Sequence, residues 1–172
     1  MLDLAFTCRE RKIKLSVYSP QPGYLSTIVR STSLLNDGYI EQFNNTVNED
    51  KYSLPLIRDM KKRVVYWIVE SKPLLDSCDM TSNDWIQIAA DIEKAYDDYD
   101  GFVILHGTDT LAYTASALSF MIENLGKPVI ITGSQIPLSE VGSDGMRNLI
   151  GALIIAGNVD IPEVKEVVII YK

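Results

Sequence analysis

The stretch from Gly101 to Gly126 changes its hydrophobic period halfway along, and this change constrains the fold more than any other feature. Residues 101–106 form a short apolar run with the length of a buried strand. From Thr110 onward the apolar residues recur at intervals of three and four, as on one face of a helix that Gly126 would end. A buried strand followed directly by such a helix is the repeating unit of α/β proteins with a parallel sheet.

The turn between the two periods, Gly107-Thr108-Asp109, has the composition of a ligand site. Gly107 permits a sharp change of backbone direction, and Asp109 is placed to cap the helix. In open α/β sheets ligands bind beyond the carboxyl ends of the strands, where a helix N-terminus favours an anion by about 0.3–2 kcal/mol. A hydroxyl and a carboxylate side by side at this point predict a site, and a plain helix cap is the alternative.

The same alternation of strands and helices is expected along much of the chain. Further strands are expected at 63–70, 129–132 and 166–171. Further helices are expected at 24–30, from Thr81 onward with Asp84 completing a capping box, and at 147–156 after a long loop at 133–145. Residues 36–59 are polar without clear periodicity and are expected to form a surface excursion. These elements predict an α/β fold with a mainly parallel sheet, flanking helices and right-handed crossovers.

Composition argues against several classes of partner. The 172 residues are 47% apolar, which suits one domain with a substantial core. The formal net charge of −7 argues against nucleic acid or an anionic membrane as a partner, because phosphate binding needs clustered Lys and Arg. No apolar run approaches the roughly 20 residues that span a bilayer. Two cysteines, and a start without a basic region or a long apolar core, indicate a cytoplasmic protein.

Several short motifs occur together and in a fixed order around the turn. They are His106-Gly107-Thr108-Asp109-Thr110, the segment 127–137 (KPVIITGSQIP), Ser143-Asp144-Gly145, Asn148-Leu149 and, upstream, the segment 75–80 (LDSCDM). The first resembles the signature motif of the L-asparaginases, and the last resembles the substrate-binding loop of that family. The similarity is to the animal cytoplasmic (type I-like) asparaginases, some of which are also called lysophospholipases. It runs from about Ser16 to the end of the sequence.

This resemblance implies a fold, a reaction and a set of site residues. The fold would be the asparaginase N-terminal α/β domain, which is Rossmann- or flavodoxin-like. The reaction would be hydrolysis of L-asparagine to L-aspartate and ammonia, with no cofactor and no metal. By resemblance Thr108 is one of two catalytic threonines, and Asp109 orients the proton network and binds the substrate α-amino group. Asp76 and Ser77 would hold the α-amino and α-carboxylate ends of the substrate. Family members are dimers or tetramers, so the resemblance implies a homo-oligomer in the full-length form.

Two parts of the family pattern are missing from this sequence. Where the family has its first strand and a Thr-Gly-Gly-Thr-Ile-Gly loop with an essential threonine, residues 1–15 are polar and basic in the middle. An ungapped count puts Thr7 and Cys8 near that loop, and we assign a nucleophile to neither. By resemblance, the family's catalytic lysine follows the last strand in a basic Arg-Gly-Asn-Arg-type segment, and Lys165 and Lys172 come too early in the pattern to be that lysine.

We therefore expect an alternative start, a misassigned exon or a truncated product. The expected organisation is an atypical segment at 1–15 that replaces the first strand and the catalytic loop, then an incomplete asparaginase N-terminal domain at 16–172, without the C-terminal domain. A missing strand would leave an open sheet edge, which favours self-association.

Other candidate residues have plainer explanations. His106, the only histidine, is expected to be a structural residue at a strand end rather than a base. Cys78 is expected to be a small loop residue rather than a nucleophile, and Asp79 either supports the site or caps a turn. Tyr18 is a candidate lid residue by resemblance, with an exposed loop tyrosine as the alternative.

Two functions stay open at this point. One is a threonine-dependent asparaginase, and the other is a non-catalytic relative that binds substrate or partner subunits without turnover. A nucleotide-binding module is disfavoured because no Gly-x-Gly-x-x-Gly follows a strand. Lysophospholipase activity has no independent support, because the chain has no Gly-x-Ser-x-Gly motif.

Overall fold

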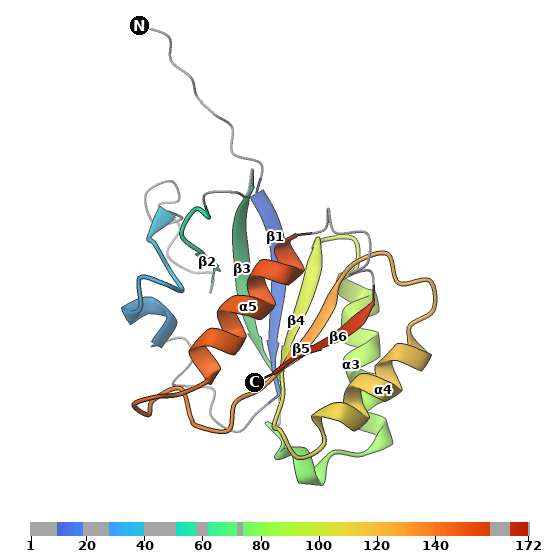
Figure 1. The fold of residues 1–172 in the computed structure, drawn as a ribbon. Helices are drawn as coiled ribbons and strands as arrows, with labels where there is room; N and C mark the ends of the chain where they lie inside the picture. The colour runs from blue at the N-terminus through green and yellow to red at the C-terminus, as the bar shows by residue number, and fades with distance from the viewer. Residues whose placement is uncertain are drawn as a thin grey trace, which may run out of the picture.

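The computed structural model describes residues 10–18, 28–39, 51–57, 62–71, 74–158 and 166–171. They build a six-stranded sheet with the strand order β2-β3-β1-β4-β5-β6 (Figure 1). The strands are β1 (Glu10–Val17), β2 (Lys51–Ser53), β3 (Arg63–Glu70), β4 (Gly101–Leu105), β5 (Val129–Thr132) and β6 (Val167–Ile170). The helices are α3 (Ser82–Ala95), α4 (Leu111–Met121) and α5 (Gly145–Gly157), with a 3-10 turn η1 (Ser77–Asp79). Every neighbouring pair is parallel except β2 with β3, so the predicted α/β fold with a mainly parallel sheet is confirmed.

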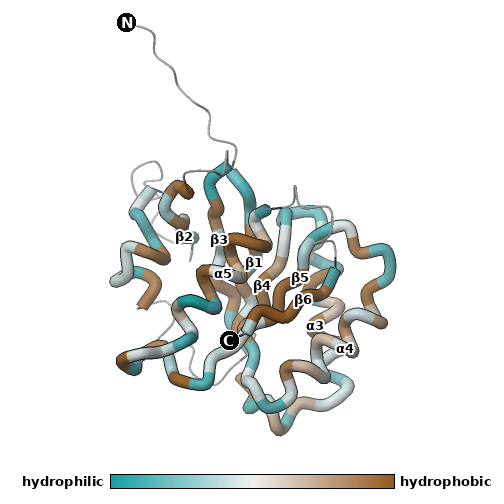
Figure 2. The backbone as a smooth tube through the Cα atoms, in the orientation of Figure 1, coloured by the Kyte–Doolittle hydropathy of each residue, from teal (hydrophilic) through white to brown (hydrophobic). Residues whose placement is uncertain are grey.

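The sheet carries a hydrophobic core on each face, because alternate strand residues point to opposite sides. Val103 of β4 and Ile130 of β5 belong to the core beneath α5, whereas Phe102 and Ile131 belong to the core beneath α3 and α4. Helix α5 crosses one face of the sheet, and α3 and α4 lie on the other (Figure 1). Hydrophobic residues are concentrated along the central strands (Figure 2). Burial on both faces explains the near-continuous apolar runs of β4 and β5.

The first strand, which we expected to be missing, is present, so that expectation is wrong. Strand β1 lies inside the sheet and pairs in parallel with both β3 and β4. Ile13 and Leu15 are fully buried beneath α5. On the opposite face Lys14 extends to α3, where its Nζ donates to the Asp91 carbonyl at 3.2 Å. We did not predict β1 because it carries several charged residues, whereas central strands of a parallel sheet are normally apolar on both faces. The open edge and the self-association that we inferred from a missing strand therefore lose their basis.

The boundaries of α4 also differ from the prediction. The helix ends at Met121 rather than at Gly126. Asn124 adopts the left-handed conformation (φ 54°), which asparagine tolerates better than most residues. At the other end Thr110 occupies the N-cap position that we assigned to Asp109. The strand–turn–helix order is confirmed, and the helix is shorter than its apolar periodicity suggests.

The remaining elements mostly follow the prediction. The strand at 63–70 is confirmed, and the stretch 36–59 differs by contributing β2 as an antiparallel edge strand. The capping box of α3 is confirmed, because the Asp84 carboxylate accepts hydrogen bonds from both the N–H and the hydroxyl of Thr81, each at 2.7 Å. Of the expected helix at 24–30 the structure describes only the end, and residues 28–31 are helical. No helix in the described part of the chain is long and apolar enough to cross a membrane.

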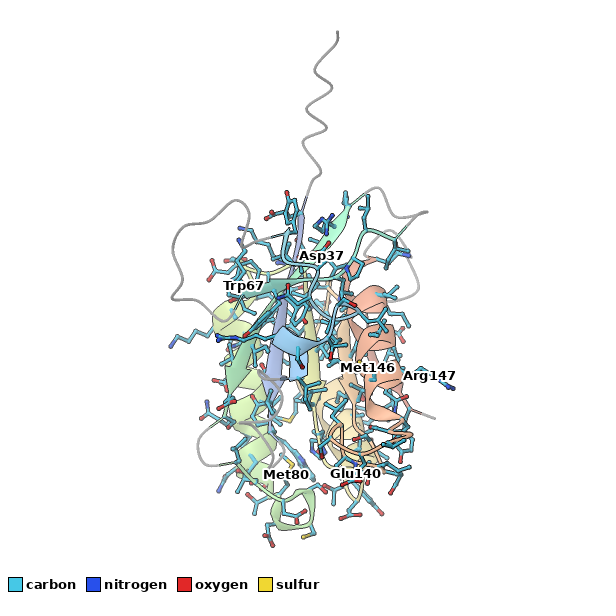
Figure 3. All side chains as sticks on the ribbon, turned by 90° about the vertical axis from the view of Figure 1, so that its left-hand side faces the viewer. Asp37, Trp67, Met80, Glu140, Met146 and Arg147 are labelled. Atoms are coloured by element: carbon cyan, nitrogen blue, oxygen red, sulfur yellow. The ribbon has the colours of Figure 1, made fainter. Side chains whose placement is uncertain are left out.

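The loops that follow the parallel strands gather at one end of the sheet. Met80, directly after η1, and Glu140, in the loop between β5 and α5, lie at this end (Figure 3). Asp37 lies at the opposite end of the molecule (Figure 3). The end that holds Met80 and Glu140 is the one at which open α/β sheets bind ligands.

Candidate active site

Thr108 and Asp109 lie in the turn between β4 and α4, as the sequence predicts. The N–H of His106 donates to the carbonyl of Thr132 at 2.9 Å, which extends the pairing of β4 with β5 up to the turn. Helix α4 begins at Leu111, so Thr108 lies next to the positive end of a helix dipole. Asp109 is exposed and Thr108 is partly buried. Both polar groups can therefore meet a small molecule from solvent.

The loop that carries Asp76 and Ser77 packs against this turn. The Thr110 hydroxyl donates to the Ser77 carbonyl at 2.7 Å, although the two residues are 33 positions apart. A β-carbon placed on Gly107 would lie 2.6 Å from Ser77 Oγ, so the absence of a side chain permits this close approach. Ser77 is only 2% exposed, whereas Asp76 is exposed and caps η1 by accepting from the Cys78 N–H at 3.5 Å. The structure therefore brings the two predicted segments together.

A third segment reaches the turn, and its site residue was not among our candidates. Gln135, which follows β5, donates from Nε2 to Thr108 Oγ1 at 3.3 Å. Gly133 allows this loop to lie close, because a β-carbon there would be 2.4 Å from the His106 carbonyl and 3.3 Å from Thr108 Cγ2. The sequence held a usable signal, since β5 was predicted to be the next parallel strand and neighbouring strands end at the same edge.

Asp144 holds the loop after β5 in place. Its carboxylate accepts from the N–H groups of Ile136 at 3.0 Å and Gln135 at 3.1 Å, and from Asn148 Nδ2 at 3.3 Å. These hydrogen bonds, with that of Ile136 contributing most, hold the pKa of Asp144 below its usual value. Asp144 is therefore an ionised anchor that positions Gln135 toward Thr108.

A small cavity adjoins the turn on the side of α5. Its volume is about 110 Å³, and its lining combines apolar side chains with the polar groups of the strand ends. The lining includes Val17, Leu105, Gly107, Ser134, Leu138 and Leu149. The cavity lies at the carboxyl ends of β1, β4 and β5, and it gives the turn a concave neighbour of the size of a small molecule.

The surroundings of Cys78 are acidic. Desolvation and the carboxylates of Asp76, Asp79 and Asp109 all raise the pKa of the Cys78 thiol. The thiolate, which is the reactive form of cysteine, is therefore disfavoured at neutral pH. This agrees with the prediction that Cys78 is a loop residue and not a nucleophile.

His106 and Tyr18 both point into the protein. His106 is 2% exposed, and burial lowers its pKa despite a hydrogen bond to the Gly107 carbonyl, which agrees with the predicted structural role. Tyr18 is 6% exposed and donates to Asp91 Oδ2 at 3.1 Å. It is therefore buried against α3, so the exposed loop tyrosine that we considered is wrong, and the lid role stays a prediction.

Thr7, Cys8, Lys165 and Lys172 lie outside the described residues. Within the described ranges, no group of three or more His, Cys, Asp or Glu side chains is arranged to hold a metal ion.

Comparison with known proteins gives a consistent result. Residues 29–172 match a family model described as Asparaginase, N-terminal. The chain is 61% identical over 149 residues to an L-asparaginase of Dirofilaria immitis, covering 86% of this chain and 25% of that protein. It is 46% identical over 140 residues to a 60 kDa lysophospholipase of Mus musculus, covering 81% of this chain and 24% of that protein.

A solved structure gives the same picture of the fold. The crystal structure of L-asparaginase I from Vibrio cholerae superposes with a TM-score of 0.63 at 43% sequence identity, covering 87% of this chain and 42% of that chain. The chain thus spans about a quarter of the length of the two relatives named above.

Proposed function

The chain belongs to the asparaginase family, and we propose that it supplies the substrate-side half of a site that hydrolyses L-asparagine to L-aspartate and ammonia. One observation carries this proposal. The Asp76-Ser77 loop and the Thr108-Asp109 turn, far apart in the sequence, are joined by the Thr110 hydroxyl bond to the Ser77 carbonyl. Hydrolysis of an amino-acid amide needs a nucleophile and anchors for both charged ends of the substrate within one site.

The roles follow from the chemistry of each group. The Thr108 oxygen would attack the substrate carboxamide carbon, the C–N bond would break, and the nitrogen would leave as ammonia with the hydroxyl proton. Water would then cleave the resulting ester to release L-aspartate and regenerate the threonine. Asp109 and Asp76 would pair with the substrate α-ammonium group, and Ser77 would bind its α-carboxylate. The N-terminal end of α4 adds positive potential next to the reacting centre.

A second candidate function is binding without turnover, and one observation favours it. A threonine hydroxyl needs a base to become a nucleophile. Among the described residues, the hydrogen-bond partner of Thr108 Oγ1 is the Gln135 amide, which donates and cannot take a proton. The hydrolytic proposal therefore requires a base that reaches the Thr108 hydroxyl when substrate is bound. Without that base the same groups would hold L-asparagine or L-aspartate unchanged.

Ammonia release from L-asparagine, measured alongside calorimetric binding of L-aspartate, separates the two. Turnover that is lost in both Thr108→Ala and Asp109→Ala supports the hydrolase, provided that Ser119→Ala, on the exposed face of α4, retains it. Binding that Asp76→Ala weakens, with no ammonia above the blank, supports the binding function. Neither binding nor turnover would exclude both functions for this chain.

We also propose a cytoplasmic location and assembly into a homo-oligomer in the full-length form. The presence of only two cysteines suits a reducing compartment. The acidic net charge of −7 argues against nucleic acid and anionic membrane as partners. Cell fractionation tests the location, and light scattering of the protein purified from its own cells tests the assembly.

A further inference from the structure

Trp85, Thr114 and His106 form a chain of hydrogen bonds that ends at the turn. The indole Nε1 of Trp85 is 2.9 Å from Thr114 Oγ1. Thr114 Oγ1 is 2.8 Å from His106 Nε2, and His106 Nδ1 is 2.6 Å from the Gly107 carbonyl. Thr114 is fully buried and His106 is 2% exposed, so water does not compete for the hydrogen bond between them.

The two ends of these hydrogen bonds fix the direction of the first and the last, and a neutral imidazole ring then fixes the direction of the middle one. An indole N–H can only donate, and a backbone carbonyl can only accept. His106 Nδ1 must therefore carry a proton to face the Gly107 carbonyl at 2.6 Å, because two acceptors at that distance would repel each other. Thr114 accepts from Trp85, and in a neutral ring with its proton on Nδ1 the other nitrogen, Nε2, accepts the Thr114 hydroxyl proton.

We infer that His106 is the neutral Nδ1–H tautomer, and that Trp85 and Thr114 are positioning residues that fix the turn carrying Thr108 through it. Trp85 comes from α3, Thr114 from α4 and His106 from the end of β4, so the chain joins three elements at the start of the turn. Burial lowers the pKa of His106, which supports a neutral ring.

The orientation of the Gly107 peptide affects the position of Thr108, because neighbouring residues leave the turn little space. Gly107 lies against Ser77, and Thr108 follows it directly. A carbonyl held by a buried imidazole cannot rotate without losing that hydrogen bond, so the orientation of the peptide before Thr108 is set from within the protein. The catalytic meaning of this positioning rests on the proposed function, whereas the tautomer and the ordering of the turn do not.

The chain contains a single histidine, so its ring can be observed without assignment ambiguity. The full chain with ¹⁵N-labelled histidine is to be examined by long-range ¹H–¹⁵N NMR between about pH 5.5 and 8, the range in which histidine normally titrates. We expect a protonated Nδ1 and a bare Nε2 throughout. A proton on Nε2, or a charged ring at pH 7, would overturn the inference.

Thr114→Val tests the positioning role, because it keeps the shape of the side chain and removes the hydroxyl. We expect a mixture of tautomers and about five- to tenfold faster exchange of the His106 N–H, which donates to the Thr132 carbonyl at the start of the turn, the effect of losing one hydrogen bond. Thr114→Ser should restore both readouts, and Ser119→Ala, which removes an exposed hydroxyl from the same helix, should change neither. An unchanged ring and an unchanged turn in folded Thr114→Val would refute the role.

Trp85→Phe provides the same test if Thr114→Val does not fold. It removes the outermost donor and keeps an aromatic ring at this position, and the hydroxyl of Thr114 is then free to reorient. We expect the preference of the His106 ring for the Nδ1–H tautomer to weaken in this variant. A preference equal to that of the wild type would refute the positioning role of Trp85. A wild-type protein that shows the Nδ1–H tautomer but neither binds L-aspartate nor releases ammonia would refute the proposed function and leave this inference standing.

Discussion

Gly107 lies so close to Ser77 that a β-carbon on Gly107 would come within 2.6 Å of Ser77 Oγ and 2.7 Å of Ser77 Cβ. Real β-carbons do not approach other atoms this closely, so the two loops of the candidate site share a contact that only glycine permits. Ser77 is buried, and its carbonyl is held by Thr110. The relative position of the substrate-binding loop and the threonine turn is therefore built into the fold.

Gly107→Ala should displace the Ser77 loop. Overpacking of this kind costs about 1–3 kcal/mol, part of it as lower stability and part as a distorted site. We expect L-aspartate binding to weaken by at least about tenfold, as 1.4 kcal/mol would produce. Calorimetry together with a melting curve measures both effects. Gly151→Ala, on α5 and away from the turn, serves as the control, and equal binding by the two variants would show that the contact does not position the loop.

The elements around this contact differed in how far the sequence predicted them. The strand at 101–105 and the turn after it were predicted from a change of pattern at Gly107. Before it the residues are continuously apolar, as in a strand buried on both faces, and after it the apolar residues recur at helical spacing. Strand β1 was missed, although Ile13, Leu15 and Val17 alternate as a strand requires. The lysines on its other face argued against a central strand, and only the tertiary structure supplies the partner of Lys14 on α3.

The candidate site was predicted in part. Thr108 and Asp109 could be found from local pattern, because a strand end and a helix start coincide there. The contact between Ser77 and Gly107 could not, because no local rule relates residues that are 30 positions apart. Gln135 was overlooked because an amide in a loop has no signature of its own, and its role depends on Asp144 holding that loop near Thr108.

Two glycines of α5 should respond in opposite ways to alanine. At Gly157 a β-carbon would lie 2.6 Å from Cγ2 of Val64, a short branched side chain that is 2% exposed in the core. At Gly151 the nearest atom is Ile170 Cγ2 at an ordinary 3.8 Å. We expect Gly157→Ala to lose about 1–3 kcal/mol by overpacking, and Gly151→Ala to gain about 0.5–1 kcal/mol from helix propensity.

Thermal unfolding measures this pair of variants. For a chain of this size, 1 kcal/mol corresponds to a shift of about 2–4 °C in Tm. The wild type should therefore melt between the two variants. Shifts of the same sign would show that the space around each glycine does not decide the outcome.

Asp37 should contribute to the loss of stability in acid. Burial alone would raise its pKa, but hydrogen bonds from Ser53, Arg63 and the Tyr39 N–H outweigh burial and hold the pKa below its usual value. A carboxyl with a lowered pKa in the folded state stabilises the fold above its unfolded pKa of about 3.9 and loses this contribution as the pH falls further.

Asp37→Asn should therefore lower Tm at neutral pH, and its difference from the wild type should shrink below about pH 4. Melting curves at a series of pH values test this. Asp98→Asn removes an exposed carboxylate at the end of α3 and should leave the pH profile close to that of the wild type. A constant difference between Asp37→Asn and the wild type at every pH would mean that the variant acts through packing and not through charge.

Asp144→Asn should loosen the loop that brings Gln135 to Thr108. The carboxylate accepts from the N–H of Ile136 with one oxygen and from the N–H of Gln135 with the other. Asparagine has a single oxygen, so one of these N–H groups must lose its acceptor, at a cost of about 1 kcal/mol. Hydrogen exchange followed by mass spectrometry should show faster exchange over residues 133–144 in this variant. Glu140→Gln, a matched change in the same loop at an exposed side chain, should leave exchange unaltered.

Because Gln135 donates to Thr108 Oγ1, we expect Asp144→Asn also to weaken L-aspartate binding. Intact binding with a loosened loop would show that Gln135 is not needed to hold the ligand.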